Sequence, residues 1–559
     1  MVFKQKISLI IFLVTCSLFL SLPIIRSGLT YDYGIGFWGP NGHDMVWHLS
    51  LINHIKNPFQ IPLPVFSGQL LKNYHPFYNI LISFLSKITP INASTWLFQI
   101  MPFLMSFIIL TLSYLLGKKI THRPIGGLIL VFLNTFANSF GWLVTLFRSG
   151  SLGGESLFWS MQSASTQINP PYALSLIFLL ILILIIYRHP HQQKFSAINL
   201  LALFTIFIFC PITKSYSAIP IYGLFAFYSL SALRKKNLQP IILLIVSFIL
   251  AALVFSIYNK SSGNLLIYKP FWFVNSMIES KDRLYLPVLA NMRYTLEESK
   301  IIGPRLITLY IVTFAIFIVG NFSWRLIGFL SLKPHQNKVI ALIVLILILI
   351  PTLFIQAGTS WNTIQFFYYA LFLSNILLTN FLVKGLQKPT IKILLFIIII
   401  TSLASNINFL QNYLGNPPPS AISNHEIEAI KFLNKLPNGT ILSYPYDQYQ
   451  KVSFLYTPLP IYLYETTSYL TAYTKHHTFV DDYMNLQNSG YDWEKRLDSS
   501  KKFFEQKSIY QDRGFLVNNH IDYIYLAGLQ KNYTNLNLGQ LYIKIIYENP
   551  EITIYQVER

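Results

Sequence analysis

The sequence predicts an all-α polytopic membrane domain of about eleven spans, followed by a C-terminal α/β or α+β domain on the outer face of the membrane. Hydrophobic residues make up 53% of the 559 positions and charged residues only 11%, against about 25% in an average soluble domain. Apolar runs of about 17 to 25 residues, the length needed to cross a bilayer, recur through the first three quarters of the chain. These observations exclude an ordinary soluble enzyme.

Each span is expected in one apolar run. The first run, 7–25, is interpreted as an uncleaved anchor, because it is long, lacks a small-x-small cleavage site and precedes further spans. The short apolar segment 75–88 is interpreted as a juxtamembrane or partly inserted helix, because counting it as a span would invert every later loop. The remaining runs are 96–116, 124–147, 171–187, 196–213, 217–233, 239–257, 304–323, 339–356, 361–383 and 390–410.

The net charge of +20 indicates topology rather than binding to nucleic acid. Residues 415–559 hold 15 acidic and 13 basic side chains, so residues 1–414 hold 7 acidic and 29 basic ones. With the N-terminus inside, every short cytoplasmic loop is basic, as the positive-inside rule requires, for example at Lys118, Arg234 and Arg325. An odd number of spans then places residues 415–559 outside. We therefore expect a multi-pass plasma-membrane protein with a cytoplasmic N-terminus, in contact with membrane lipids and not with nucleic acid.

The seven carboxylates of residues 1–414 all fall in expected outer loops, 26–95, 148–170 and 258–303. Ionisable residues at mid-membrane depth are expected along the ion paths of coupled transporters. Their absence from the expected spans favours chemistry at the outer membrane surface. The seven residues are Asp32, Asp44, Glu155, Glu279, Asp282, Glu297 and Glu298.

A proline run at 416–419 marks a linker between two expected domains. The first, 1–414, is a multi-span transmembrane catalytic domain that includes the first outer loop, 26–95, and the second, 415–559, is an extracytoplasmic soluble domain. Aromatic and amide side chains gather at 469–493; they suit a sugar-facing surface or, alternatively, the aromatic covering of a membrane-proximal surface. Within 415–559, periodicity predicts helices over 425–436 and 495–511 and strands over 440–444, 521–526, 541–547 and 551–557, the last alternating like an edge strand.

The first outer loop carries the densest group of titratable side chains, His43, Asp44, His48 and His54. Asp44 and His48 share one face if the segment is a helix, because they are four residues apart. A carboxylate just outside the bilayer can act as a general base or bind a divalent cation. Alternatively, Asp44 is the N-cap of a helix over 45–55. A zinc site made of the three histidines is disfavoured, because their spacings do not match helical i, i+4 pairing.

An acidic residue soon after the first span, followed by Tyr74-His75-Pro76-Phe77 before an apolar helix, resembles the GT-C glycosyltransferases. In the protein O-mannosyltransferases and aminoarabinose transferases of this superfamily, the corresponding places hold an essential acidic residue and a His-Pro-Pro-Leu motif. Here Phe77 and Tyr78 replace the second proline and the leucine. The resemblance covers roughly residues 1–125 by motif and the whole chain by architecture.

This resemblance implies transfer of a sugar from a polyprenyl-phosphate donor to an acceptor glycan, lipid or protein at the outer face. Asp44 would remove the acceptor proton while the anomeric carbon is attacked with inversion, and His43, His48 and His75 would bind substrate. No cofactor is indicated, and a divalent cation is an open alternative. Growing charge on the leaving phosphate calls for an arginine, and Arg283 and Arg293 in the loop 258–303 are the candidates.

Further candidates lie in other outer segments. Phe158-Trp159 followed by Ile168-Asn169-Pro170-Pro171-Tyr172 is similar to bacterial and archaeal multi-span proteins placed near this superfamily, and makes Asn169 a candidate binding residue. Glu155 supplies a second carboxylate. Asn362 and Gln365, three residues apart at the start of the expected tenth span, can bind sugar hydroxyls from one helical face, or belong only to a helix cap.

Two other classes of function stay open at this point. A transporter or flippase of lipid-linked saccharides also needs many spans, but it usually has a two-fold repeat of spans, which the sequence lacks. A non-catalytic membrane scaffold with a ligand-binding outer domain is the other class. A Gly-rich nucleotide loop is missing, so ATP is not indicated as an energy source.

Overall fold

The computed structural model describes residues 2–260, 266–300, 303–333, 335–506, 512–534 and 536–558. The chain forms two compact units. Unit 1 consists of Met1–Ser21, Phe103–Ser256 and Ser262–Asn412, and unit 2 of Leu22–Pro102, Ile257–Ser261 and Tyr413–Arg559. This division differs from the expected one at 414/415, because the first outer loop belongs to the same unit as the C-terminal residues.

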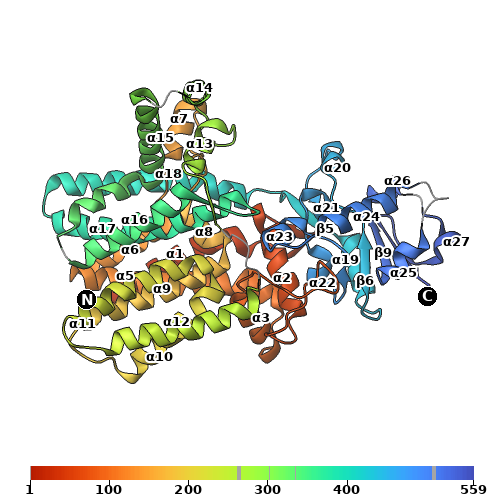
Figure 1. Cartoon of the computed structure of the whole chain (residues 1–559), viewed down its shortest axis with the longest axis horizontal. Coiled ribbons are helices and arrows are strands. Elements are labelled where there is room, and N and C mark those ends of the chain that lie inside the picture. The colour runs from red at the N-terminus through yellow and green to blue at the C-terminus, as the bar shows by residue number, and fades with distance from the viewer. Residues whose placement is uncertain are drawn as a thin grey trace. The chain divides into compact units, whose positions relative to one another are not determined.

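Unit 1 is built from long apolar helices. Helix α16 packs along α17, and α9 packs against α10 and α11 (Figure 1). A two-stranded antiparallel sheet joins β3, Leu266–Tyr268, to β4, Phe354–Gln356. The helices are α1 (Val2–Ile25), α5 (Met101–Thr121), α6 (Pro124–Phe136), α7 (Gly141–Ser149), α8 (Gln162–Ile168), α9 (Pro170–Arg188), α10 (Ala197–Thr213), η3 (Ser215–Ser217), α11 (Ala218–Leu233), α12 (Gln239–Tyr258), α13 (Trp272–Glu279), α14 (Pro287–Glu298), α15 (Pro304–Phe322), η4 (Ser323–Ser331), α16 (His335–Leu353), η5 (Ser360–Thr363), α17 (Ile364–Gly385) and α18 (Pro389–Leu414).

Eight helices in the described part of the chain are long and apolar enough to cross a membrane, or nine if the bent pair α6 and α7 counts as one span. The expected number of eleven is therefore not confirmed. The run 124–147 is the bent pair, with an angle of 51°, and the runs 196–213 and 390–410 correspond to the shorter apolar helices Ala197–Thr213 and Pro389–Leu403. Apolarity predicted these segments, but it does not reveal where a helix breaks.

Arg325 explains how the break between α6 and α7 is tolerated. Its Nη2 donates to the Ala137 carbonyl oxygen at 2.6 Å and its Nη1 to that of Asn138 at 3.3 Å, and both carbonyls lie in the break. A broken helix leaves backbone groups without partners, which apolar surroundings cannot satisfy. The sequence placed Arg325 in a basic cytoplasmic loop, but in the structure it lies in η4, within the candidate span Pro304–Ser331, and only 1% of the residue is exposed. The expected end of this span at residue 323 is therefore wrong.

Unit 2 joins the first outer loop to the C-terminal residues through a four-stranded sheet of order β1-β2-β5-β7. Strand β2 pairs antiparallel with β5, and β5 pairs parallel with β7. Gly34, with φ +120°, is needed in β2 because a Cβ there would collide with the Ile422 carbonyl oxygen. The strands are β1 (Thr30–Tyr31), β2 (Gly34–Phe37), β5 (Ser420–Ser423) and β7 (Leu459–Pro460).

A second, five-stranded sheet of order β10-β11-β9-β6-β8 forms the core of the C-terminal residues. Its strands are β6 (Thr440–Ser443), β8 (His477–Thr478), β9 (Ile521–Ala527), β10 (Ile543–Glu548) and β11 (Ile552–Val557). The expected strands 440–444, 521–526, 541–547 and 551–557 are found at β6, β9, β10 and β11. Strand β11 is not an edge strand as expected, because β10 and β9 pair with it on either side. Alternation of apolar and polar residues predicts which face of a strand is buried, but it does not predict how many strands pair with it.

Short helices of unit 2 accompany these two sheets, and α19 and α22 lie near β6 (Figure 1). The helix expected over 425–436 is α19, and the helix expected over 495–511 is α24, with residues 507–511 outside the described part. The segment 75–88 contains α3, which begins at Phe77 and is too short to be counted as a span. The helices are η1 (Gly39–Gly42), α2 (Asp44–His54), α3 (Phe77–Ile88), α4 (Ala93–Thr95), η2 (Trp96–Ile100), α19 (Asn424–Leu433), α20 (Gln448–Ser453), α21 (Ile461–Tyr464), α22 (Tyr469–Tyr473), α23 (Tyr483–Asn488), α24 (Glu494–Glu505), α25 (Arg513–Asn518), α26 (Gln530–Tyr533) and α27 (Leu538–Leu541).

Candidate active site

Asp44 is the first residue of α2, directly after the turn η1. The N-cap position is occupied by His43, so the expected N-cap role of Asp44 is wrong. The helix itself is where the sequence predicted it, within one residue. A carboxylate in the first turn of a helix is stabilised by the positive end of the helix dipole. The next residues, Met45 and Val46, are fully buried, so they fix the start of α2 in the core of unit 2.

Asp44 belongs to a chain of three hydrogen-bonded side chains. Its Oδ1 lies 2.9 Å from His43 Nδ1, and His43 Nε2 lies 3.1 Å from Oδ1 of Asp482. The exposed fraction of the side chain is 54% for Asp44, 5% for His43 and zero for Asp482. One carboxylate therefore faces outward, while the histidine and the second carboxylate behind it are shielded from water.

The protonation of His43 follows from its two partners. Burial alone would lower its pKa, but Asp482 and Asp44 outweigh burial and raise the pKa of His43 well above its usual 6.5. Only the imidazolium has two N–H donors, and here both ring nitrogens face a carboxylate oxygen. At neutral pH, His43 therefore carries a positive charge, and this charge orients the Asp44 carboxylate from the buried side.

Asp482 is held by its own place in the backbone. It is the N-cap of α23, with φ +47° and ψ +51°, and its Oδ1 accepts from Asn485 Nδ2 at 3.0 Å. Asp tolerates this left-handed conformation better than most residues because its short side chain bonds to nearby backbone. Asp482 was not among the residues predicted from the sequence. It lies in the aromatic segment 469–493 that was singled out, but nothing in the sequence pairs it with residue 43.

The other histidines of the first outer loop have separate partners. His48 Nδ1 lies 2.8 Å from Asn79 Oδ1, and the His75 ring stacks on Tyr74 at 4.9 Å between centroids. His54 Nδ1 lies 2.9 Å from the Ser50 carbonyl oxygen, and burial lowers the pKa of His54 to about 4.

The geometry does not gather these histidines into a zinc site. Within the described ranges, no group of three or more His, Cys, Asp or Glu side chains is arranged to hold a metal ion. His43, His48 and His54, the three residues of the disfavoured zinc site, bond to separate partners. A divalent cation in the reaction stays an open prediction.

The remaining candidate residues belong to unit 1. Asn169 is the N-cap of α9, and its side chain accepts from the Tyr172 backbone N–H at 3.2 Å. Gln365 Nε2 lies 3.5 Å from Asn362 Oδ1, so these two side chains lie together as their spacing predicts. Glu155 is 9% exposed. Their roles in binding stay predictions.

The two arginines of the loop 258–303 have different surroundings. Arg293 Nη2 lies 2.6 Å from Glu279 Oε1, and the residue is 6% exposed. The Arg283 guanidinium lies over the Trp159 ring at 3.9 Å, and its nearest carboxylate, Asp282, is 3.5 Å away and largely exposed. The charge of Arg293 is thus balanced by Glu279 inside the protein. Arg283 instead stacks on the Trp159 ring, and its counter-ion Asp282 is exposed.

Comparison with known proteins finds no matching family model and no matching curated protein. Among solved structures, the chain is similar to the archaeal oligosaccharyltransferase AglB from Archaeoglobus fulgidus in complex with an inhibitory peptide and a dolichol-phosphate, with 10% identity and a TM-score of 0.48 over 94% of this chain and 70% of that one. It is also similar to the Archaeoglobus fulgidus oligosaccharyltransferase complexed with Zn and sulfate, with 14% identity and a TM-score of 0.49 over 98% and 73%.

A third similar structure is ArnT from Cupriavidus metallidurans bound to undecaprenyl phosphate, with 10% identity and a TM-score of 0.47 over 98% of this chain and 97% of that one. These neighbours are GT-C glycosyltransferases, the superfamily that the motifs of the sequence resemble.

Proposed function

We propose that this chain is an integral membrane glycosyltransferase that moves a sugar from a polyprenyl-phosphate donor to an acceptor at the outer face of the membrane. The proposal rests on one observation above all: Asp44 is an exposed carboxylate that a buried His43–Asp482 pair holds in place, shortly after the first apolar helix. Helices long and apolar enough to span a membrane agree with a lipid-linked donor.

Asp44 is the base in the proposed reaction. The acceptor hydroxyl or amide loses its proton to Asp44 as its heteroatom attacks the anomeric carbon of the donor sugar. The bond from that carbon to the phosphate oxygen breaks, and polyprenyl phosphate leaves with the electron pair, so the anomeric configuration is inverted. The His43 imidazolium keeps the Asp44 carboxylate pointed in one direction during proton transfer.

A cation is needed where charge grows on the leaving phosphate, and an arginine can bind it through two N–H groups. Arg283 is the stronger of the two candidates, because Arg293 already pairs with Glu279. His48, His75, Glu155, Asn169, Asn362 and Gln365 are proposed to bind substrate.

The test is a transfer assay with the full-length protein in liposomes and a panel of radiolabelled polyprenyl-phosphate hexoses and pentoses, with membrane extract as the source of acceptor. We expect Asp44→Asn to reduce label transfer by roughly 10² to 10⁴-fold, the usual contribution of a general base. Asp32→Asn is the matched control, since Asp32 is an exposed carboxylate of the same loop, and it should transfer like wild type.

Equal transfer by wild type and Asp44→Asn would show that Asp44 is not the base. A wild-type protein that moves labelled lipid between leaflets without releasing its sugar would be a flippase, and one that only retains the lipid would be a scaffold. Either of these results would contradict the proposed transferase.

A further inference from the structure

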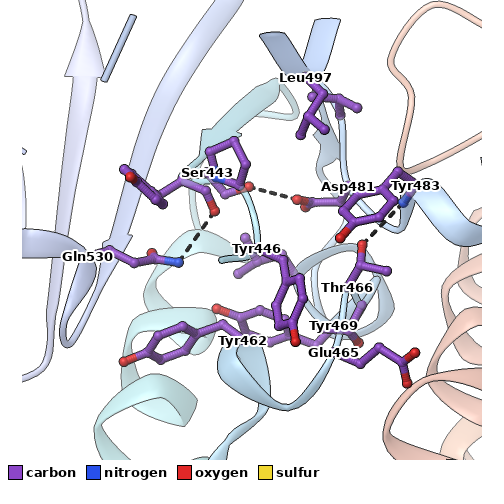
Figure 2. A pocket seen from close by; sticks show the side chains of 15 residues that line it. Ser443, Tyr446, Tyr462, Glu465, Thr466, Tyr469, Asp481, Tyr483, Leu497 and Gln530 are labelled. Atoms are coloured by element: carbon purple, nitrogen blue, oxygen red, sulfur yellow. Dashed lines mark hydrogen bonds between the residues drawn. The ribbon is translucent and has the colours of Figure 1, made fainter. Parts of the chain in front are cut away.

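Unit 2 contains a pocket among its C-terminal residues (Figure 2). Its empty space, counted out to the solvent, is about 430 Å³. The wall comes from the end of β6 and the segment after it, from α21 and α22 with the loop between them, and from residues 480–483, Leu497 and Gln530. The lining residues are Ser443, Tyr444, Pro445, Tyr446, Tyr462, Glu465, Thr466, Thr467, Tyr469, Leu470, Val480, Asp481, Tyr483, Leu497 and Gln530.

The lining has the chemistry of a site for an uncharged polyol. Five tyrosines line the pocket, and the C–H bonds of a sugar ring can rest on the face of an aromatic ring because that face is electron-rich. Hydroxyl, carboxyl and amide groups offer both donors and acceptors for sugar hydroxyls. None of these lining residues is Lys, Arg or His, so the pocket has no cation to bind a phosphate or a carboxylate.

Several polar groups of the pocket are already fixed by hydrogen bonds. Ser443 Oγ donates to Asp481 Oδ1 at 2.9 Å, and the Tyr483 backbone N–H donates to Thr466 Oγ1 at 3.2 Å. Gln530 Nε2 donates to the Tyr444 carbonyl oxygen at 3.4 Å. Figure 2 shows these bonds around the pocket. Side chains that are already fixed lose little conformational entropy when a ligand binds. This smaller cost favours the binding of a sugar, which makes only weak contacts.

Residues 465–467 and the segment 480–483, which form much of this wall, also hold the proposed base in position. Thr467 Oγ1 donates to the Gly42 carbonyl oxygen at 3.0 Å, just before His43 and Asp44. Asp482, which bonds to His43 at 3.1 Å, stands between the pocket residues Asp481 and Tyr483. All of these residues belong to unit 2. A ligand in the pocket would therefore contact the same segments that position Asp44.

We propose that this pocket binds a neutral sugar ring of the acceptor, which makes the acceptor a glycan or glycoconjugate. This inference rests on the proposed transferase function, because it assigns the pocket to the substrate that loses its proton to Asp44.

Glu465 and Asp481 also allow an amino sugar, but Asp481 argues for hydroxyl groups. Burial raises the pKa of the Asp481 carboxyl to about 7. A carboxyl of raised pKa can donate to a sugar hydroxyl as well as accept from one, and its Oδ1 already accepts from Ser443 Oγ at 2.9 Å.

The test measures binding separately from transfer. Full-length protein in lipid nanodiscs, free of sugar detergents, is examined by saturation-transfer NMR with methyl pyranosides of glucose, galactose, mannose and N-acetylglucosamine. Glucosamine and glucose 6-phosphate serve as cationic and anionic probes. We expect at least one neutral pyranoside to bind, and the anionic probe to bind less well.

Two pocket variants and two matched controls locate the site. Tyr446→Ala and Glu465→Gln should weaken binding about tenfold or more, the effect of losing a hydrogen bond to a charged group or an aromatic contact. Tyr449→Ala, on an exposed side chain three residues from Tyr446, and Glu428→Gln, on an exposed helix, should leave binding unchanged.

Asp44→Asn separates this inference from the proposed function, since it should bind sugar like wild type even though transfer is lost. If the protein binds sugar with intact specificity but transfers none, the pocket assignment is supported and the proposed transferase function is contradicted. Transfer without pyranoside binding, binding that neither pocket variant weakens, or preference for glucose 6-phosphate would each overturn the pocket assignment.

Discussion

His43 Nε2 lies 3.1 Å from Asp482 Oδ1, although 439 residues separate them in the chain. The two groups are buried, so their interaction is weakly screened by water. Asp482 is one of the two carboxylates that raise the pKa of His43, and it is the one that never meets solvent. We therefore regard Asp482 as a positioning residue, which acts on the reaction through His43 and Asp44.

Asp482→Asn should lower the turnover of sugar transfer about ten- to a hundredfold and change its pH dependence. The wild-type imidazolium persists to a pH well above 6.5, and the activity that needs it is lost only as the pH rises through this raised pKa. Without the charge of Asp482, the lowering effect of burial on the pKa of His43 is opposed only by Asp44, so this pKa falls. The loss of activity should therefore occur at a lower pH. The measurement is the rate of transfer from pH 5 to about 9.

Asp492→Asn is the control for this substitution, because Asp492 is exposed and pairs only with Lys495 among the ion pairs of the described residues. It should match wild type in rate and pH profile. A purely structural role for Asp482 would lower the amount of folded enzyme without moving the profile, and identical profiles in wild type and Asp482→Asn would contradict the positioning role.

Burial of Glu426 in α19 makes the stability of unit 2 depend on pH between about 4.5 and 8. Its side chain closes a capping box, since Oε2 accepts from the Ser423 backbone N–H at 3.2 Å while Ser423 Oγ accepts from the Glu426 N–H at 3.1 Å. Burial raises the pKa of Glu426 from 4.5 to about 8. Between these two values the unfolded chain releases its proton first, so the folded state loses stability as the pH rises, up to about pH 8.

Glu426→Gln should remove this loss, because glutamine forms the same capping box and has no proton to release. Wild type and variant should melt alike near pH 4.5, and at pH 8 the variant should be more stable, on the order of a few kcal/mol. Thermal unfolding followed by tryptophan fluorescence at several pH values measures this. Glu428→Gln, on an exposed side chain two residues away, should behave like wild type, and a parallel pH dependence in Glu426→Gln would refute the expectation.

The sequence predicted those features that depend on neighbours along the chain. The long apolar helices, α19, α24, the main strands of the second sheet and the helix that begins at Asp44 all follow from periodicity and composition. Asp44 could be singled out because carboxylates are scarce in residues 1–414 and this one follows the first span directly.

Features that depend on distant partners could not be predicted. Nothing local indicates that β2 pairs with β5, that β11 lies between two strands, or that Asp482 reaches His43. The position of Arg325 was wrong for the same reason, since a basic residue between two apolar runs is typical of a loop, and its burial depends on backbone carbonyls freed at Ala137 and Asn138.

The two candidate arginines of the outer loop 258–303 should respond differently to substitution. Arg283 stacks on Trp159 and is partly exposed, so Arg283→Gln should reduce transfer about tenfold or more through weaker stabilisation of the leaving phosphate. The melting temperature should hardly change. Arg293 is buried against Glu279 and lies 3.6 Å from Glu297. Arg293→Gln leaves Glu279 without its counter-ion, and should lower the melting temperature by several degrees.

Transfer per folded molecule separates these roles, with melting curves recorded on the same samples. Arg283→Lys keeps the charge but not the two-point contact, and it should recover only part of the activity. If Arg293→Gln abolishes transfer while melting like wild type, Arg293 is the phosphate-binding residue instead.

Orientation of the chain decides whether Asp44 can work at the outer face. The basic loops predict that the N-terminus is cytoplasmic and that residues 415–559 are outside. The two cysteines, Cys16 and Cys210, are both buried, so single cysteines placed elsewhere can be labelled selectively with a membrane-impermeant maleimide. Lys544 in β10 and Lys118 in α5 are exposed and give one reporter on each expected side.

In intact cells, Lys544→Cys should react with the maleimide, and Lys118→Cys should react only after the membrane is permeabilised. Wild type supplies the background from the buried cysteines. Labelling of Lys118→Cys in intact cells with protection of Lys544→Cys would invert the topology. Because Asp44 shares unit 2 with Lys544, that result would place the proposed base on the cytoplasmic side, and the donor would then have to present its sugar phosphate there.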